Sequence, residues 1–124
     1  MLVIDDDHAV RELIKNILET YGYGVTAVSN GEVGYWLVSN ESFDLVITDI
    51  LMAGIDGITL IDRIRLLGTR GRIPCLVVTG SGIKSKADEA MKAGADMVIQ
   101  KPFDLRTLLG GVRELLGRPS VTVH

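Results

Sequence analysis

Hydrophobic and polar positions alternate along the chain in blocks, and this pattern predicts its secondary structure. Five short apolar runs, rich in Val, Ile and Leu, occupy residues 2–4, 24–28, 45–49, 75–79 and 97–99. Runs of this length and composition are typical of strands that are buried on both faces. Each run is followed by a longer stretch whose apolar residues recur every three or four positions, which is typical of an amphipathic helix. The pattern therefore predicts five strands that alternate with five helices.

Polar residues at the start of each predicted helix support these boundaries. A short side chain with an oxygen acceptor can satisfy the free N–H groups of a first helical turn. The residues at these positions are Asp7, Asn30, Asp56, Ser85 and Asp104. Ser85 also has capping-box spacing to Asp88. In the second helix, the spacing of the apolar residues predicts that Val33, Trp36 and Leu37 form the buried face.

The alternation of buried strands with amphipathic helices predicts an α/β fold. Strands that are apolar on both faces form parallel sheets with helices packed on both sides. Right-handed crossovers restrict the connections and favour a doubly wound five-stranded parallel sheet in the order 2-1-3-4-5. This fold is a flavodoxin-like three-layer sandwich of the (βα)5 type. We expect one domain over residues 1–117 and a C-terminal tail or linker remnant over residues 118–124.

Composition and charge exclude several classes of function. The 124 residues suffice for one hydrophobic core. The net charge of −3 argues against a nucleic acid interface, because phosphate contacts need a basic face. One cysteine and two histidines exclude a disulfide framework and argue against a zinc site. No apolar run approaches the roughly 18 residues of a membrane span, so we expect a cytoplasmic protein.

The candidate functional residues all follow predicted strands. Asp5 and Asp6 follow the first strand, and Asp49 ends the third. Thr79 ends the fourth strand, and Lys101 follows the fifth. The carboxyl ends of parallel strands share one edge of the sheet, where open α/β folds place their ligands. We therefore expect these five residues, which lie far apart in the sequence, to meet in one pocket.

Three carboxylates in one pocket predict a bound cation and suggest phosphoryl chemistry. Two carboxylates about 4 Å apart repel each other by roughly 4 kcal/mol at an effective dielectric constant near 20. An all-oxygen site suits Mg²⁺, which would also let a carboxylate attack an anionic phosphoryl group. Aspartate is a known phosphoryl acceptor. Lys101 would supply a mobile positive charge and Thr79 a hydroxyl for a phosphoryl oxygen.

The ordered set of motifs resembles the receiver domain of two-component response regulators. The resemblance covers essentially the whole chain, and although each motif alone is weak, their order and separations are those of the family. The matching segments are Val3-Ile4-Asp5-Asp6, Val46-Ile47-Thr48-Asp49, Asp56-Gly57, Val77-Val78-Thr79, Gly94-Ala95-Asp96 and Lys101-Pro102-Phe103.

The resemblance implies the identity of the acceptor and of the metal ligands. Asp49 would take a phosphoryl group from a phosphohistidine of a sensor kinase or a histidine phosphotransfer protein. Asp5 and Asp6 would hold Mg²⁺ together with Asp49, and the backbone carbonyl of Leu51 would complete the protein ligands. The domain would then be a signalling phosphoacceptor rather than an enzyme, although it would assist its own phosphorylation and autodephosphorylation.

The resemblance also implies how the phosphorylated state is signalled. Thr79 would move to bond the phosphoryl group, and Lys101 would pair first with Asp49 and then with that group. This change would bias a two-state surface on the fourth helix, fifth strand and fifth helix. An effector domain would lie outside this chain. The sequence does not identify the cognate kinase, and it leaves the oligomeric state open, with a homodimer among the alternatives.

Two residues depart from the family pattern near the expected site. Many receivers have proline where this chain has Ala53, so the loop after Asp49 is expected to be less rigid. Many receivers also have an aromatic residue three positions before the lysine, and this chain has Val98 there. The usual switch by an aromatic side chain is therefore in question, whereas a shift of the backbone is still available.

Three other functions fit the same fold less well. A flavin electron carrier would place a phosphate after the first strand, where three successive acids would repel it. A phosphohydrolase with an aspartyl-phosphate intermediate would resemble Asp-x-Asp at the nucleophile, whereas this chain has Leu51 at the second position. A pseudo-receiver, an interaction module that phosphorylation does not regulate, typically lacks the acceptor or the acids. This chain retains both, so the pseudo-receiver is the alternative that stays open.

Overall fold

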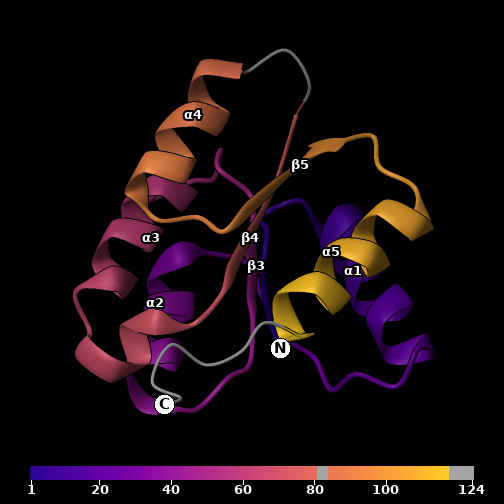
Figure 1. The fold of residues 1–124 in the computed structure, drawn as a ribbon, viewed down its shortest axis with the longest axis horizontal. Helices are drawn as coiled ribbons and strands as arrows, with labels where there is room; N and C mark the ends of the chain where they lie inside the picture. The colour runs from indigo at the N-terminus through magenta and orange to yellow at the C-terminus, as the bar shows by residue number, and fades with distance from the viewer. Residues whose placement is uncertain (81–83, 118–124) are drawn as a thin grey trace.

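The computed structural model describes residues 1–80 and 84–117 (Figure 1). The strands are β1 (Leu2–Ile4), β2 (Thr26–Val28), β3 (Val46–Thr48), β4 (Cys75–Gly80) and β5 (Met97–Lys101). The helices are α1 (His8–Thr20), α2 (Gly31–Asn40), α3 (Gly57–Arg65), a 3-10 helix η1 (Gly68–Arg72), α4 (Lys84–Ala93) and α5 (Leu105–Gly117). The strands form one parallel sheet in the order β2-β1-β3-β4-β5, which confirms the predicted fold. Within the described ranges, none of the helices has the length and apolar character needed to span a membrane.

The register of the sheet brings the ends of β1 and β3 side by side. Ile4 pairs with Thr48, so the residues that follow them, Asp5 and Asp49, leave neighbouring strands at the same level. β4 and β5 extend farther along the same edge, where Gly80 pairs with Lys101. The carboxyl edge of the sheet therefore gathers residues from four segments of the chain.

Alternate residues of the strands build a separate core on each face of the sheet. Leu2 and Ile4 belong to the core that α2, α3 and α4 cover, whereas Val3 between them belongs to the core under α1 and α5. Figure 1 shows these two groups of helices on opposite sides of the strands. Apolar residues on both faces of each strand are what the short continuous runs of the sequence predict.

Helix α2 packs on the sheet through Gly31, Gly34 and Val38, and of the three residues predicted to be buried only Leu37 packs against the core. Val33 and Trp36 were expected inside but are exposed, and 59% of the Trp36 surface is accessible. The buried positions include Gly31 and Gly34. A β-carbon at Gly34 would lie 2.4 Å from the side chain of Ile4, so the backbone of α2 approaches the sheet too closely for a larger residue. The orientation of α2 is therefore set by the close approach of its backbone to the sheet rather than by the size of its apolar side chains.

The predicted helix caps agree with the structure wherever it describes them. Asp7, Asn30 and Asp56 each accept a hydrogen bond from an N–H group of the first turn of α1, α2 and α3. Asp104 accepts one from the N–H of Thr107 in α5 at 2.8 Å. The side chain of Ser85 lies outside the described part of the chain, and α4 begins at Lys84, one residue before it.

Arg65, at the end of α3, ties together several segments at the amino edge of the sheet. Its guanidinium makes five hydrogen bonds of 2.6–3.1 Å, as many as it has N–H groups. The acceptors are the backbone carbonyls of Gly71, Ile73 and Gly94 and the carboxylate of Asp96. Asp96 also accepts a hydrogen bond from the N–H of Cys75 at 2.8 Å. Arg65 therefore holds the starts of β4 and β5 against the end of α3.

Replacing Arg65 by alanine is expected to lower the free energy of unfolding by about 2–4 kcal/mol, because it leaves several half-buried acceptors without a charged donor. Urea denaturation would measure the change. The matched control is Arg63→Ala in the same helix, since the exposed side chain of Arg63 makes no hydrogen bond or ion pair with the described residues. Its effect should stay within about 0.5 kcal/mol. Equal losses in the two variants would contradict the role assigned to Arg65.

Candidate functional site

Asp49 directly follows the central strand β3 and carries a nearly buried carboxylate. Only 9% of the surface of Asp49 is accessible to solvent. One carboxylate oxygen, Oδ1, accepts a hydrogen bond from the N–H of Ile50 at 2.6 Å. The other, Oδ2, accepts one from the Lys101 ammonium at 2.8 Å. Asp49 is thus held at the point where the apolar strand gives way to the loop that leads to α3.

Asp5 lies beside Asp49 at the end of β1 and is even less accessible, at 2%. Its Oδ1 accepts a hydrogen bond from the N–H of Asp7 at 2.9 Å, and its Oδ2 is 3.4 Å from the ammonium of Lys101. Burial raises the pKa of the Asp5 carboxyl, although the Asp7 N–H and the Lys101 charge oppose the shift. The negative charge of Asp49 raises this pKa further. The charge of Asp49 therefore disfavours ionisation of the Asp5 carboxyl.

Lys101, at the end of β5, contacts both carboxylates with one ammonium group. Partial burial of Lys101 lowers its pKa, but the hydrogen bond and charge of Asp49 and the charge of Asp5 outweigh that effect. The pKa of Lys101 consequently lies above its ordinary value, so the ammonium stays charged throughout the neutral range. The favourable contribution of this charge to stability would be lost only as the pH rises through that elevated pKa.

Asp6 and Leu51 lie at the rim of the same edge. The exposed Asp6 accepts a hydrogen bond through Oδ2 from the N–H of Ala53 at 3.1 Å, which links the turn after β1 to the loop after Asp49. Leu51 lies in that loop with 56% of its surface exposed. In the described structure, Leu51 makes no hydrogen bond to Asp5, Asp49 or Lys101.

Thr79 supplies an unused hydroxyl group. It belongs to β4, beside β3, and is 1% exposed. Its Oγ1 has no hydrogen-bond partner among the described residues. Buried polar atoms almost always have partners, so an unpaired hydroxyl at a ligand-binding edge calls for an explanation. The hydroxyl of Thr79 could donate a hydrogen bond to an oxygen of a group bound at this edge.

The donor chemistry of the edge suits a hard divalent cation. Asp5 and Asp49 are two nearly buried carboxylates that share one positive charge, and the carboxylate of Asp6 follows directly in the chain. Oxygen donors without histidine or cysteine are those that Mg²⁺ prefers. Among the described residues, no three acidic, histidine or cysteine side chains lie together in a way that could hold a metal ion.

Two residues that support the Asp49 main chain were not identified as functional from the sequence. The hydroxyl of Thr48 donates to the carbonyl oxygen of Asp49 at 2.9 Å. The α-carbon of Gly57 approaches the same carbonyl so closely that an added β-carbon would be only 2.1 Å from the oxygen. The Asp56-Gly57 motif was noted in the sequence, but only the three-dimensional approach explains the glycine.

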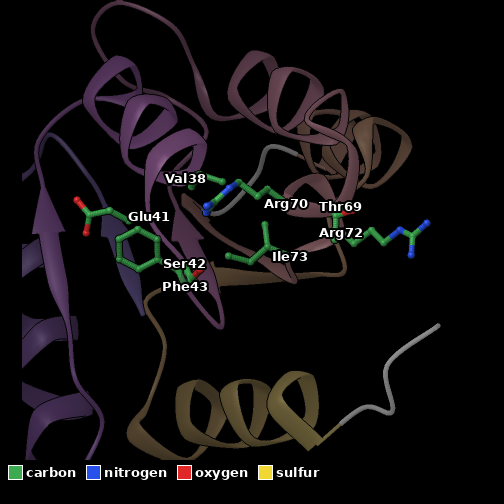
Figure 2. Close-up of a pocket in the computed structure, with 8 residues that line it drawn as sticks. All are labelled: Val38, Glu41, Ser42, Phe43, Thr69, Arg70, Arg72 and Ile73. Atoms are coloured by element: carbon green, nitrogen blue, oxygen red, sulfur yellow. The ribbon is translucent and has the colours of Figure 1, made fainter. Parts of the chain in front are cut away.

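A cavity of about 460 Å³ lies at the opposite edge of the sheet, away from these residues. Figure 2 shows it between the end of α2 and η1. Its lining consists of Val38, Glu41, Ser42, Phe43, Thr69, Arg70, Arg72 and Ile73. These residues precede the starts of β3 and β4, so the cavity is separate from the cluster at the carboxyl edge.

Comparison with known proteins identifies the family that the sequence motifs resemble, and the match covers nearly the whole chain. The family model described as the response regulator receiver domain matches residues 1–113. The response regulator MprA of Mycobacterium sp. (strain KMS) is 37% identical over 97% of this chain and 51% of its own length. Protein RcaC of Microchaete diplosiphon is 38% identical over 97% of this chain and 18% of its own length. The chain therefore spans about half, or less, of these curated relatives.

Solved structures agree in fold. The receiver domain of NtrX from Brucella abortus has a TM-score of 0.88 and 27% identity, with 95% of this chain and 98% of that chain covered. A CheY-like response regulator receiver domain protein from Methanospirillum hungatei has a TM-score of 0.86 and 33% identity, with coverage of 93% and 90%. The chain belongs to the family of response regulator receiver domains of two-component systems.

Proposed function

We propose that this receiver domain accepts a phosphoryl group on Asp49 from a phosphohistidine. The observation that carries the proposal is the contact of one Lys101 ammonium with the nearly buried carboxylates of Asp49 and Asp5. A carboxylate oxygen of Asp49 attacks phosphorus, and the phosphorus–nitrogen bond to the imidazole breaks. The imidazole leaves with the bonding electron pair and takes up a proton. Hydrolysis of the resulting acyl phosphate by water returns Asp49 to its resting state.

The neighbouring residues meet the charge requirements of this transfer. Asp5, Asp6 and Asp49 would hold Mg²⁺ together with the backbone carbonyl of Leu51. The ion would offset the negative charges of the carboxylates and of the phosphoryl oxygens. Lys101 is positioned to exchange its hydrogen bond with Asp49 for one with a phosphoryl oxygen. This Mg²⁺ ligand set is the one that the resemblance to receiver domains implies, and its oxygen donors suit the ion.

Thr79 and Lys101 would pass the phosphorylated state to the surface formed by α4, β5 and α5. The hydroxyl of Thr79 lacks a partner in the described structure and would donate to a phosphoryl oxygen. Thr79 is the penultimate residue of β4, which precedes α4 in the chain, and Lys101 ends β5, which precedes α5. Small shifts in these two residues would therefore bias that surface. Val98 packs as a partly buried aliphatic residue in β5. We therefore favour a backbone shift of β4 and β5 over the turning of an aromatic ring.

The proposed partner is a cytoplasmic sensor histidine kinase or a histidine phosphotransfer protein. Residues 1–117 would form the receiver, and residues 118–124, outside the described part of the chain, would form a tail or linker toward an effector. Curated relatives about twice as long as this chain support the idea that an output region accompanies such domains. Homodimerisation of the phosphorylated form would be a way to control that output.

Phosphorylation by a small donor tests the proposal directly. Incubation of the chain with acetyl phosphate and Mg²⁺ should add one phosphoryl group, as measured by intact mass spectrometry. Peptide mapping after chemical trapping of the acyl phosphate should place it on Asp49. Removal of divalent cations with a chelator should suppress the reaction. A chain that gains no phosphate under these conditions would favour the pseudo-receiver alternative, an interaction module without phosphorylation.

A further inference from the structure

Arg11 reaches back from the first turn of α1 to the end of β1. Its Nη1 donates a hydrogen bond to the backbone carbonyl oxygen of Asp5 at 2.8 Å. Its Nη2 is 2.9 Å from Nδ1 of His8, and because a guanidinium can only donate, that ring nitrogen is the acceptor. The two contacts hold the guanidinium between the helix and the carboxylate-rich turn.

The contact with the Asp5 carbonyl fixes the peptide unit that joins the two acids Asp5 and Asp6. This unit is planar, so its orientation sets the directions in which both neighbouring residues leave it. The other groups of Asp5 are already held. Its N–H donates to the carbonyl of Val28 at 3.2 Å, and Oδ1 accepts from Asp7. The Arg11 hydrogen bond completes the support of this turn from the helix side.

Helix α1 does not need Arg11 for its own start. Asp7 already caps the helix by accepting hydrogen bonds from the N–H groups of Ala9 and Val10 at 2.9 and 3.3 Å. The Arg11 guanidinium bonds instead to a carbonyl of the strand that precedes the turn. A purely structural role at the helix terminus therefore does not account for where its side chain points.

We propose that Arg11 is a positioning residue for the cation site, holding the Asp5–Asp6 peptide unit so that both carboxylates can face a divalent ion. This inference rests on the proposed function, since it assigns a supporting role around the same site. Arg11 makes no contact with the ion or the phosphoryl group in this scheme. Residues that orient metal ligands in this way typically contribute about 10–100-fold to metal affinity.

Titration calorimetry of the unphosphorylated chain with Mg²⁺ tests the inference without relying on activity. Arg11→Gln should weaken Mg²⁺ binding about tenfold. Arg11→Lys keeps the charge but not the planar fork, so its affinity should fall between those of Arg11→Gln and the wild type. Lys15→Gln is the matched control, because it removes a positive charge from the same helix and Lys15 has no contact with the turn among the described residues. It should bind Mg²⁺ as the wild type does.

The rate of phosphorylation by acetyl phosphate at varied Mg²⁺ provides a second readout. Arg11→Gln should raise the half-saturating Mg²⁺ concentration by the same factor and leave the rate at saturating Mg²⁺ unchanged. A lower thermal midpoint with unaltered Mg²⁺ affinity would overturn the inference and assign Arg11 to stability alone. Equal weakening by Lys15→Gln would overturn it in favour of a general charge effect. If Arg11→Gln does not fold, the Mg²⁺ affinity of the folded Arg11→Lys variant decides the question. A Mg²⁺ affinity equal to that of the wild type would then contradict the proposal.

These outcomes separate the inference from the proposed function. A wild-type chain that binds no Mg²⁺ and takes up no phosphate would contradict both. A wild-type chain that does both, alongside an Arg11→Gln variant with the same Mg²⁺ affinity, would contradict only the role of Arg11. The predicted pattern is therefore a loss of affinity confined to the Arg11 variants.

Discussion

Replacing Asp49 by asparagine is expected to abolish phosphate uptake from acetyl phosphate. The amide has nearly the shape of the carboxylate, and its oxygen can still accept the hydrogen bond from the N–H of Ile50. It lacks the anionic oxygen that attacks phosphorus, and the other carboxylates of the proposed site, Asp5 and Asp6, are assigned to the cation. The loss should therefore be complete, whereas circular dichroism should show an unchanged fold. Intact mass spectrometry of the treated variant would measure the result.

Asp56→Asn is the matched control for this experiment. Asp56 lies in the same β3–α3 connection and caps α3 by accepting a hydrogen bond from the N–H of Thr59 at 2.8 Å. Asparagine caps helices as well as aspartate does, so the chemical change is the same but the expected effect on phosphate uptake is small. An Asp49→Asn variant that still gained a phosphoryl group at the wild-type level would contradict the assignment of Asp49 as the acceptor.

Gly57→Ala should produce one of the two largest losses of stability among the variants considered, together with Arg65→Ala. The added β-carbon would be 2.1 Å from the carbonyl oxygen of Asp49 and 3.0 Å from its carbonyl carbon. Both are backbone atoms at the end of a buried central strand, so neither can rotate away as a side chain would. Overpacking of this kind typically costs about 1–3 kcal/mol, and the backbone contact places Gly57 at or above the upper limit. Urea denaturation would measure this loss.

Phosphate uptake should fall in the same Gly57→Ala variant, because any relaxation must displace Asp49 itself. Gly110→Ala is the control. Gly110 lies on the exposed side of α5, and an added β-carbon there meets nothing within 4 Å. Alanine in a helix interior is more favourable than glycine by about 0.5–1 kcal/mol. This control should therefore be more stable than the wild type. A Gly57→Ala protein with wild-type stability and phosphate uptake would show that the close approach has no consequence.

Much of the fold was predictable from the sequence because the strands are buried on both faces. That burial requires continuous apolar runs, and such runs in alternation with amphipathic stretches have few solutions. The same reasoning placed Asp5, Asp49 and Lys101 at one edge, and the three side chains are in contact there. The family that the motifs predicted is the one whose model matches the chain.

The features that sequence patterns missed depend on distances between backbones. Trp36 was expected in the core because large apolar residues usually pack inward, but the glycines of α2 brought that helix close to the sheet on another face. Arg65 and Arg11 resemble ordinary surface arginines in a helical sequence. Several of their acceptors are backbone carbonyl oxygens of other segments. Every residue has a backbone carbonyl, so the sequence does not show which ones act as acceptors. Periodicity cannot reveal contacts of this kind.

The ammonium of Lys101 between Asp5 and Asp49 has a consequence for how the resting domain behaves. The Lys101 ammonium neutralises part of the negative charge of these carboxylates from within the chain. The chain can therefore fold without a bound metal ion. A divalent ion would then bind beside a positive charge that is already in place. Such a domain would remain folded through wide swings in free magnesium, although the proposed phosphorylation would still require the ion.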